Sequence, residues 1–221
     1  MANGHPVKTR DRILLKSLSL FNEQGERQVT TNHIAAALNM SPGNLYYHFA
    51  NKEAIIFELF GQYVRLMQEQ LTLPDDRPIS QPDKIALFEA VLSLLWQYRF
   101  LHRDMTHLLS ENDSLRDSYR LFAHGVQQGL RRVYQRLSES GLFEASDEDV
   151  DALIINIWIV ATSWSNFLAS TGFFGSDGTL TEDLMRRGIY QVICLEAPYL
   201  RGEAARGLGD LKASYSNGLR G

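Results

Sequence analysis

Residues 29–55 read VTTNHIAAALNMSPGNLYYHFANKEAI, a stretch that predicts two short helices joined by a tight turn. The first helix follows a Thr-Thr pair and directs Ile34 and Leu38, four residues apart, toward the interior. An Asn-Met turn comes next. Ser41 then caps the second helix, and Pro42 occupies its first position, where a missing amide hydrogen costs nothing. This order is typical of a helix-turn-helix, in which the leading end of the second helix faces DNA.

The start of this second helix carries groups that suit DNA. Small residues over 41–44 allow the backbone to approach the floor of a groove. Asn44 can hydrogen-bond a base edge, and the ring of Pro42 can contact a thymine methyl group. Four further side chains offer hydroxyl, imidazole or ammonium groups to phosphate oxygens, and such contacts set register rather than sequence: Tyr46, Tyr47, His48 and Lys52.

The flanking segments complete a compact three-helix unit. A preceding helix places Leu14, Leu18 and Phe21 on one stripe, and Gly25 supplies its stop. Asn51 is placed to cap a following helix that continues the apolar stripe. We therefore expect a DNA-binding domain over residues 1–55, with the helix from 51 leading onward.

The remainder of the chain predicts longer helices. No proline falls between residues 83 and 197, and apolar residues recur there at spacings of three and four without strand-like alternation. We expect an all-α fold, a linker over 71–83, a helical sensing and dimerisation domain over 56–201 and a flexible tail over 202–221. Thr179 and Glu182 have the spacing of a capping box before the final helix.

The stretch around the turn closely resembles the DNA-binding signature of the TetR family of regulators. The resemblance runs from Thr9 to about Phe60 and is carried by a specific set of residues: Ile34, Ala35, Leu38, Ser41, Gly43, Leu45, Tyr46, Tyr47, His48, Phe49, Lys52 and Glu53. It implies an all-α homodimer whose helix from Ser41 to Phe49 reads operator DNA, and a variable C-terminal domain that often holds a small-molecule pocket.

Individual roles also follow from the resemblance. It implies phosphate contacts by Thr31, Tyr47, His48 and Lys52, and base contacts by Asn32, Pro42, Gly43 and Asn44. Thr30, Ser41 and Tyr46 complete the predicted DNA-binding set. Asn32 departs from the family pattern, because arginine or lysine often stands at this position. Asn32 therefore lacks the basic side chain that would make the guanine contact expected there.

Aromatic and soft side chains are frequent in the C-terminal part. They could line a cavity between helices for a small apolar or amphipathic effector, although for any one of them a place in the ordinary core is the commoner outcome. The candidates for this effector pocket are Trp96, Phe100, Met105, His107, Phe122, Trp158 and Trp164.

The segment from Val150 to Leu168 is apolar on more than one face, which a solvent-facing helix of a monomer would not tolerate. Together with the final helix it could form an isologous four-helix contact between two copies. The predicted interface residues are Ile154, Ile157, Ala161, Leu184, Ile189 and Val192. A two-fold dimer presents two reading helices and so predicts a pseudo-palindromic operator of double-stranded DNA.

Composition argues against several other classes. A net charge of −4 disfavours an architectural protein that coats DNA through many phosphate contacts. A single cysteine, Cys194, excludes an internal disulfide and cysteine-based metal sites. His102 and His107 are five residues apart and diverge around a helix, and no HExxH motif is present. We expect no metal, no cofactor and no enzymatic activity.

The apolar segments of the sequence indicate where in the cell the protein is found. The N-terminus lacks the apolar run of a secretory signal, and the single cysteine suits a reducing compartment. The uncharged stretch over 152–176 is long enough to cross a bilayer, but its many Ser, Thr and Asn residues favour a helix buried between protein surfaces. We expect a cytoplasmic protein without a membrane role.

Overall fold

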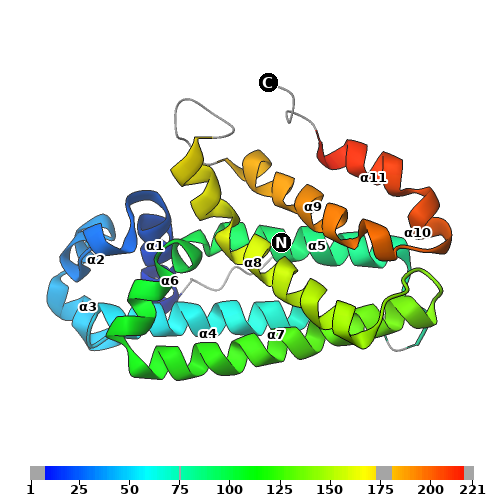
Figure 1. Cartoon of the computed structure of the whole chain (residues 1–221). Helices are drawn as coiled ribbons and strands as arrows, with labels where there is room; N and C mark the ends of the chain where they lie inside the picture. Colours follow the sequence, from blue (N-terminus) through cyan, green and yellow to red (C-terminus); the bar gives the residue numbers. More distant parts are fainter. Residues whose placement is uncertain (1–7, 75, 173–180, 217–221) are drawn as a thin grey trace, which may run out of the picture. The chain divides into compact units, whose positions relative to one another are not determined.

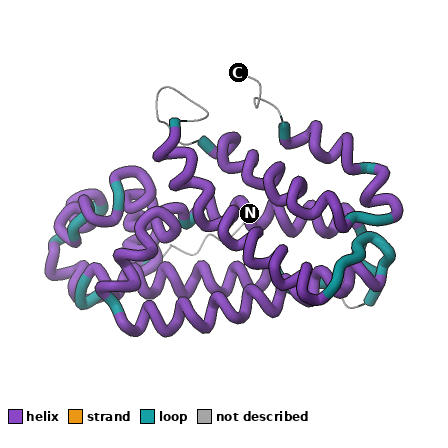
Figure 2. Tube along the Cα trace, in the orientation of Figure 1, coloured by secondary structure: helices purple, strands orange, loops and turns teal. Residues whose placement is uncertain are grey.

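A computed structural model describes residues 8–74, 76–172 and 181–216. Most of these residues are helical and none forms a strand; one isolated antiparallel bridge joins Phe143 and Leu200 (Figure 2). The expected all-α class is confirmed. Figure 1 labels the α-helices, and the order of elements among the described residues is α1 Thr9–Gln24, η1 Glu26–Gln28, α2 Thr31–Ala37, α3 Pro42–His48, α4 Lys52–Gln70, α5 Gln81–Gln97, α6 Arg99–Glu111, α7 Asp113–Glu139, α8 Asp147–Thr171, α9 Glu182–Glu196, η2 Ala197–Tyr199, α10 Gly202–Arg206 and α11 Leu208–Tyr215.

The helices divide into two compact units. The first contains the chain up to Val64 together with Tyr98–Asp117, and the second contains Arg65–Gln97 and the residues from Ser118 onward. These units differ from the expected domains because α6 belongs to the first one. Helix α4 is continuous through the division and contributes to both units.

The first unit is built on apolar residues of α1 to α4 and α6. Phe21 of α1 packs against Phe100 of α6 with ring centroids 5.2 Å apart. The Arg103 guanidinium of α6 also donates to the Phe21 carbonyl at 2.7 Å. Gly25 ends α1 with a φ of 92°, a conformation that favours glycine, and Asn51 Oδ1 accepts from the Ala54 amide at 2.8 Å. Both predicted helix ends are therefore confirmed.

The second unit has its core between α5, α8, α9 and α11. The buried cluster contains Leu92, Trp164, Leu168, Met185, Ile189, Ile193 and Tyr215. A Cβ at Gly188 of α9 would lie 3.1 Å from Trp164 Cδ1, so the absence of a side chain there lets α9 approach α8 closely. By length and hydropathy alone α8 could cross a membrane, a test that core helices of soluble proteins also pass.

One expectation about the C-terminal part is wrong, and another falls partly outside the described residues. Residues 202–206 and 208–215 form α10 and α11, because Ala204 and Tyr215 find buried positions, so this part is not a flexible tail. Thr179 lies outside the described residues, and the cap of α9 is Thr181, whose side chain accepts from the Leu184 amide at 3.3 Å.

Candidate nucleic-acid interface

Local hydrogen bonds fix α2 and the turn after it. The Thr30 hydroxyl accepts from the His33 amide at 3.3 Å, and the Thr30 amide donates to His33 Nδ1 at 3.4 Å. Asn39 adopts a left-handed φ of 54°, which asparagine tolerates better than most residues. The Met40 amide donates to the Ala35 carbonyl at 3.0 Å. The direction in which the chain enters α3 is thus set by these contacts.

Helix α3 buries its centre and exposes its start. Leu45 and Phe49 are buried, whereas residues 41–44 are exposed. The Ser41 hydroxyl accepts from the Asn44 amide at 3.2 Å, so the cap uses the backbone of Asn44 and leaves its side chain at the surface. A Cβ at Gly43 would meet nothing within 4 Å, and packing inside the described chain therefore does not require glycine there.

The two tyrosines of α3 differ in their surroundings. Tyr46 is 48% exposed, and its hydroxyl lies 2.9 Å from Thr31 Oγ1, which ties α3 to the first turn of α2. Tyr47 is 85% exposed and contacts the edge of the His48 ring, with centroids 5.2 Å apart. Asn32 of α2 is also exposed. The predicted residues of α2 and α3 therefore lie at or near the surface, and the contact between Tyr46 and Thr31 joins the two helices.

Lys52 has a partner that the sequence pattern did not indicate. Its ammonium lies 2.6 Å from Glu26 Oε1 and donates to the Glu26 carbonyl at 3.2 Å. Glu26 is buried in η1, and its second oxygen, Oε2, has no hydrogen-bond partner among the described residues. Lys52 thus neutralises a buried carboxylate, which ties the start of α4 to η1.

The seven predicted effector residues are divided between the two units. Phe100, Met105 and His107 lie on α6 in the first unit, where Phe100 is fully buried against Phe21. The other four, Trp96, Phe122, Trp158 and Trp164, lie in the second unit. The spacing of apolar residues could not reveal that α6 belongs to the first unit, because α6 packs on α1, about eighty residues earlier in the chain.

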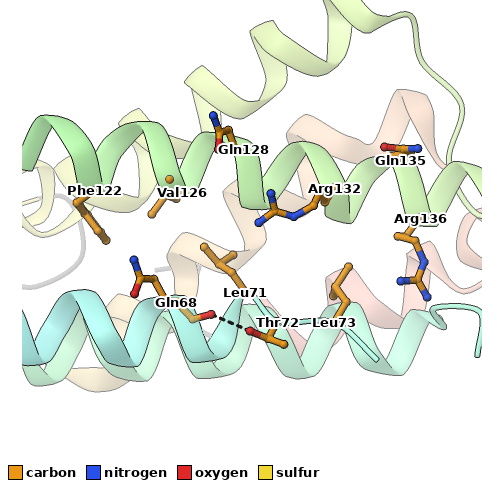
Figure 3. A pocket seen from close by; sticks show the side chains of 11 residues that line it. Gln68, Leu71, Thr72, Leu73, Phe122, Val126, Gln128, Arg132, Gln135 and Arg136 are labelled. Atoms are coloured by element: carbon orange, nitrogen blue, oxygen red, sulfur yellow. Dashed lines mark hydrogen bonds between the residues drawn. The ribbon is translucent and has the colours of Figure 1, made fainter. Parts of the chain in front are cut away.

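Within the second unit, Phe122 is the predicted effector residue that lines a cavity of about 510 Å³ between the end of α4 and α7 (Figure 3). Its ring also contacts that of Trp158 at 6.0 Å. Trp164 belongs to the core, where its indole donates to the Leu184 carbonyl at 2.9 Å, and Trp96 packs against that core. The polar lining of the cavity escaped prediction because glutamine and arginine on an amphipathic helix resemble a solvated face.

The predicted dimer residues need correction. Ile154, Ile157, Ile189 and Val192 are buried inside the single chain, and Ala161 and Leu184 are half-buried. Ile157, Ala161, Ile189 and Val192 face α5 across a small apolar hollow within the unit. The exposed apolar side chains of α8 are instead Ile155, Ile159 and Phe167. Because α8 is apolar on both faces, the pattern could not tell which face packs on α5 and α9.

The described residues contain no group of three or more His, Cys, Asp or Glu side chains that could hold a metal ion.

Comparisons with known proteins match both parts of the chain. A family model described as "Bacterial regulatory proteins, tetR family" matches residues 13–59, and one described as "Bacterial transcriptional repressor" matches residues 62–208. A solved TetR-family transcriptional regulator from Marinobacter aquaeolei VT8 is 43% identical, with a TM-score of 0.86 over 95% of this chain and 99% of that one.

More distant relatives are described as a repressor or a transcriptional regulator. A probable acrEF/envCD operon repressor of Escherichia coli K12 is 27% identical over 68% of this chain and 71% of the relative. A regulator from Saccharomonospora viridis, solved in complex with choline, is 22% identical with a TM-score of 0.65 over 87% of this chain and 98% of that one.

Proposed function

The chain belongs to the TetR family of bacterial transcription regulators and is a DNA-binding regulator, and we propose that it is a repressor that binds a pseudo-palindromic operator as a homodimer. The observation that carries this proposal is the exposed start of α3, held on a turn whose conformation is fixed by local hydrogen bonds. Rigid presentation supports sequence reading, because base contacts require side chains held in productive positions.

The residues divide by chemistry. We assign base contacts to Asn32, Pro42, Gly43 and Asn44, and the empty space beside Gly43 supports close approach of the α3 backbone to a groove. Phosphate contacts are assigned to other residues of α2 to α4, of which Tyr47 is the most exposed: Thr31, Tyr47, His48 and Lys52. The ion pair with Glu26 gives Lys52 a second role in holding the unit together.

A response to a small effector is the second part of the proposal. The relative from Saccharomonospora viridis was solved with choline, and another structural neighbour, SmeT, with triclosan. In this chain the cavity beside Phe122 offers a volume within the range of small-molecule sites. Helix α4 begins next to α3 in sequence, and its residue Gln68 lines that cavity, so one helix joins the two regions. We further propose that the protein acts in the cytoplasm, where a bacterial DNA-binding regulator meets its operator.

Selection from random duplexes tests the DNA-binding part. The full chain is incubated with randomised double-stranded DNA at fixed, moderate salt, and the recovered sequences are expected to share an inverted repeat. Asn44→Ala should change the preferred base at one position of each half-site, with a cost of about 1–3 kcal/mol at that base pair. Recovery of no common sequence would overturn the proposal, and an unchanged preference in Asn44→Ala would remove its base-reading role.

A further inference from the structure

We propose that the groove between the end of α4 and α7 binds an amphipathic organic anion, with its apolar part on Phe122, Val126 and Leu71 and its charged group at Arg132. This inference rests on the proposed response to a small effector and names the chemical class of that effector. All of these residues lie in the second unit, and this groove is the cavity of about 510 Å³ described above.

The floor of the groove is apolar and fixed in place. Phe122, Val126 and Leu71 are buried although they line an open space. The Phe122 ring packs against the rings of Tyr119 and Trp158, both 6.0 Å away between centroids, which restricts its movement. Gly125 lines the groove on the exposed side of α7, and a Cβ there would meet nothing within 4 Å, which leaves room above the apolar floor.

The polar lining is basic. Arg132 and Arg136 line the groove together with glutamine side chains, and among the residues that the structure describes no aspartate or glutamate does so. Arg136 is already engaged, since its guanidinium donates to the carbonyls of Pro74 and Arg77, each at 2.8 Å, and lies 3.9 Å from Glu139. Arg132 is exposed and makes no hydrogen bond or ion pair with any residue that the structure describes. Figure 3 shows it extending along α7 above Leu71.

The end of α4 does not present a bare row of carbonyls to an anion. Within that last turn, the Met67 carbonyl accepts from the Leu71 amide at 3.1 Å, and the Glu69 carbonyl accepts from the Thr72 amide at 3.2 Å. The Gln68 carbonyl accepts from the Thr72 hydroxyl at 3.1 Å, the bond drawn in Figure 3. These bonds reduce the negative potential that the end of α4 would otherwise present to an anion.

A matched pair of fluorescent probes separates charge from apolar contact. 8-Anilinonaphthalene-1-sulfonate is an amphipathic anion, and N-phenyl-1-naphthylamine has the same ring system without the sulfonate. Both are titrated into the full-length protein at low salt. We expect the sulfonate to bind more tightly than the amine, because a charged group bonded to Arg132 adds to the apolar contact.

Three variants locate the binding. Arg132→Gln should lower the affinity for the sulfonate probe by at least about tenfold, in line with the loss of one charge-assisted contact. The affinity for the neutral amine should stay unchanged. Arg131→Gln is the matched control, because Arg131 is adjacent to Arg132, equally basic and paired with Asp151 of α8. This substitution should leave the affinity for both probes unchanged. Gly125→Leu should lower the affinity for both probes, because the leucine side chain would enter the groove. Far-UV circular dichroism and melting temperature confirm that each variant folds.

Equal sulfonate affinity in Arg132→Gln and the parent protein, or equal affinity of the parent for both probes, would overturn the proposal. Binding of the selected operator without any probe is measured in parallel and should be the same in Arg132→Gln as in the parent. If operator binding is intact and the sulfonate is insensitive to Arg132, the groove assignment alone is wrong. If the parent protein selects no operator, the proposed function itself is wrong.

Discussion

Lys84, Glu196 and Tyr134 form a buried polar network inside the second unit. The Lys84 ammonium donates to Glu196 Oε2 at 2.6 Å, and the Tyr134 hydroxyl donates to Glu196 Oε1 at 2.6 Å. The Lys84 and Glu196 side chains are 1% and 0% exposed. Burial, the Glu196 charge and this hydrogen bond raise the pKa of Tyr134 well above 10, so its hydroxyl remains the donor. The network joins α5, α7 and α9.

We expect Lys84→Met to lower the free energy of unfolding by about 3–5 kcal/mol, because it leaves the Glu196 carboxylate buried without its cation. Urea unfolding measures this change. The double variant Lys84→Met/Glu196→Leu should be more stable than Lys84→Met alone, since it removes the unpaired charge. Arg131→Gln, which breaks an exposed pair with Asp151, is the control and should change stability by less than about 1 kcal/mol. Equal losses in Lys84→Met and the control would contradict this role for the pair.

His102 makes the stability of the first unit depend on pH. It is buried on α6, with its Nε2 3.2 Å from the Tyr63 hydroxyl, and burial lowers its pKa from 6.5 to about 4. Between these values the unfolded chain binds the extra proton more readily than the folded one, so stability falls as pH drops from about 6.5 to about 4.

His102→Gln should flatten this acid-side fall by up to about 3 kcal/mol, while retaining a polar partner for Tyr63. The measurement is the urea midpoint across pH 4 to 8, followed with a probe of the first unit such as hydrogen exchange of α6. A variant whose stability falls as steeply as that of the parent would show that His102 is not the titrating group.

At the scale of elements, glycines on α7 set how closely it packs on the end of α4. A Cβ at Gly129 would lie 3.0 Å from Leu71 Cδ1 and 3.3 Å from Leu71 Cβ, whereas one at Gly125 would meet nothing within 4 Å. Gly129→Leu should therefore lower the free energy of unfolding by about 1–3 kcal/mol, because the added side chain would overpack the contact with Leu71. Gly125→Leu, one turn earlier, should stabilise by up to about 1 kcal/mol through helix propensity. Urea unfolding compares the two, and equal stability would mean that α4 and α7 do not meet at Gly129.

Which elements could be predicted from sequence depends on how local their determinants are. The caps at Ser41 and Asn51 and the stop at Gly25 involve neighbouring residues, so spacing was enough to place α3, α4 and the end of α1. The position of α6 was missed because it depends on Phe100 meeting Phe21, a contact that no local pattern encodes. The motif predicted the exposed start of α3, whose DNA contacts stay a prediction, whereas the pairing of Lys52 with Glu26 depends on the fold.

At the scale of the whole molecule, α8 presents an exposed face that lacks charge. Ile155 and Ile159 are one helical turn apart and are 51% and 54% exposed. No Asp, Glu, Lys or Arg occurs between Asp151 and the end of α8. Exposed apolar groups on an uncharged face favour burial against a second copy, and a two-fold axis would bring the same face of each copy together. We therefore expect this face to form the interface in place of the set centred on Ile154 and Ile157, which the chain buries itself.

We expect Ile159→Glu to convert the protein to a monomer, because a two-fold contact would bring two buried, uncompensated carboxylates close together. Sedimentation velocity over a range of concentrations measures the change. Leu15→Glu, at an apolar α1 position that is 61% exposed, is the matched control and should leave the dimer intact. The monomer should also bind a full inverted repeat no more tightly than a single half-site, since it presents one α3. A fully dimeric Ile159→Glu protein would show that the two copies meet through another surface.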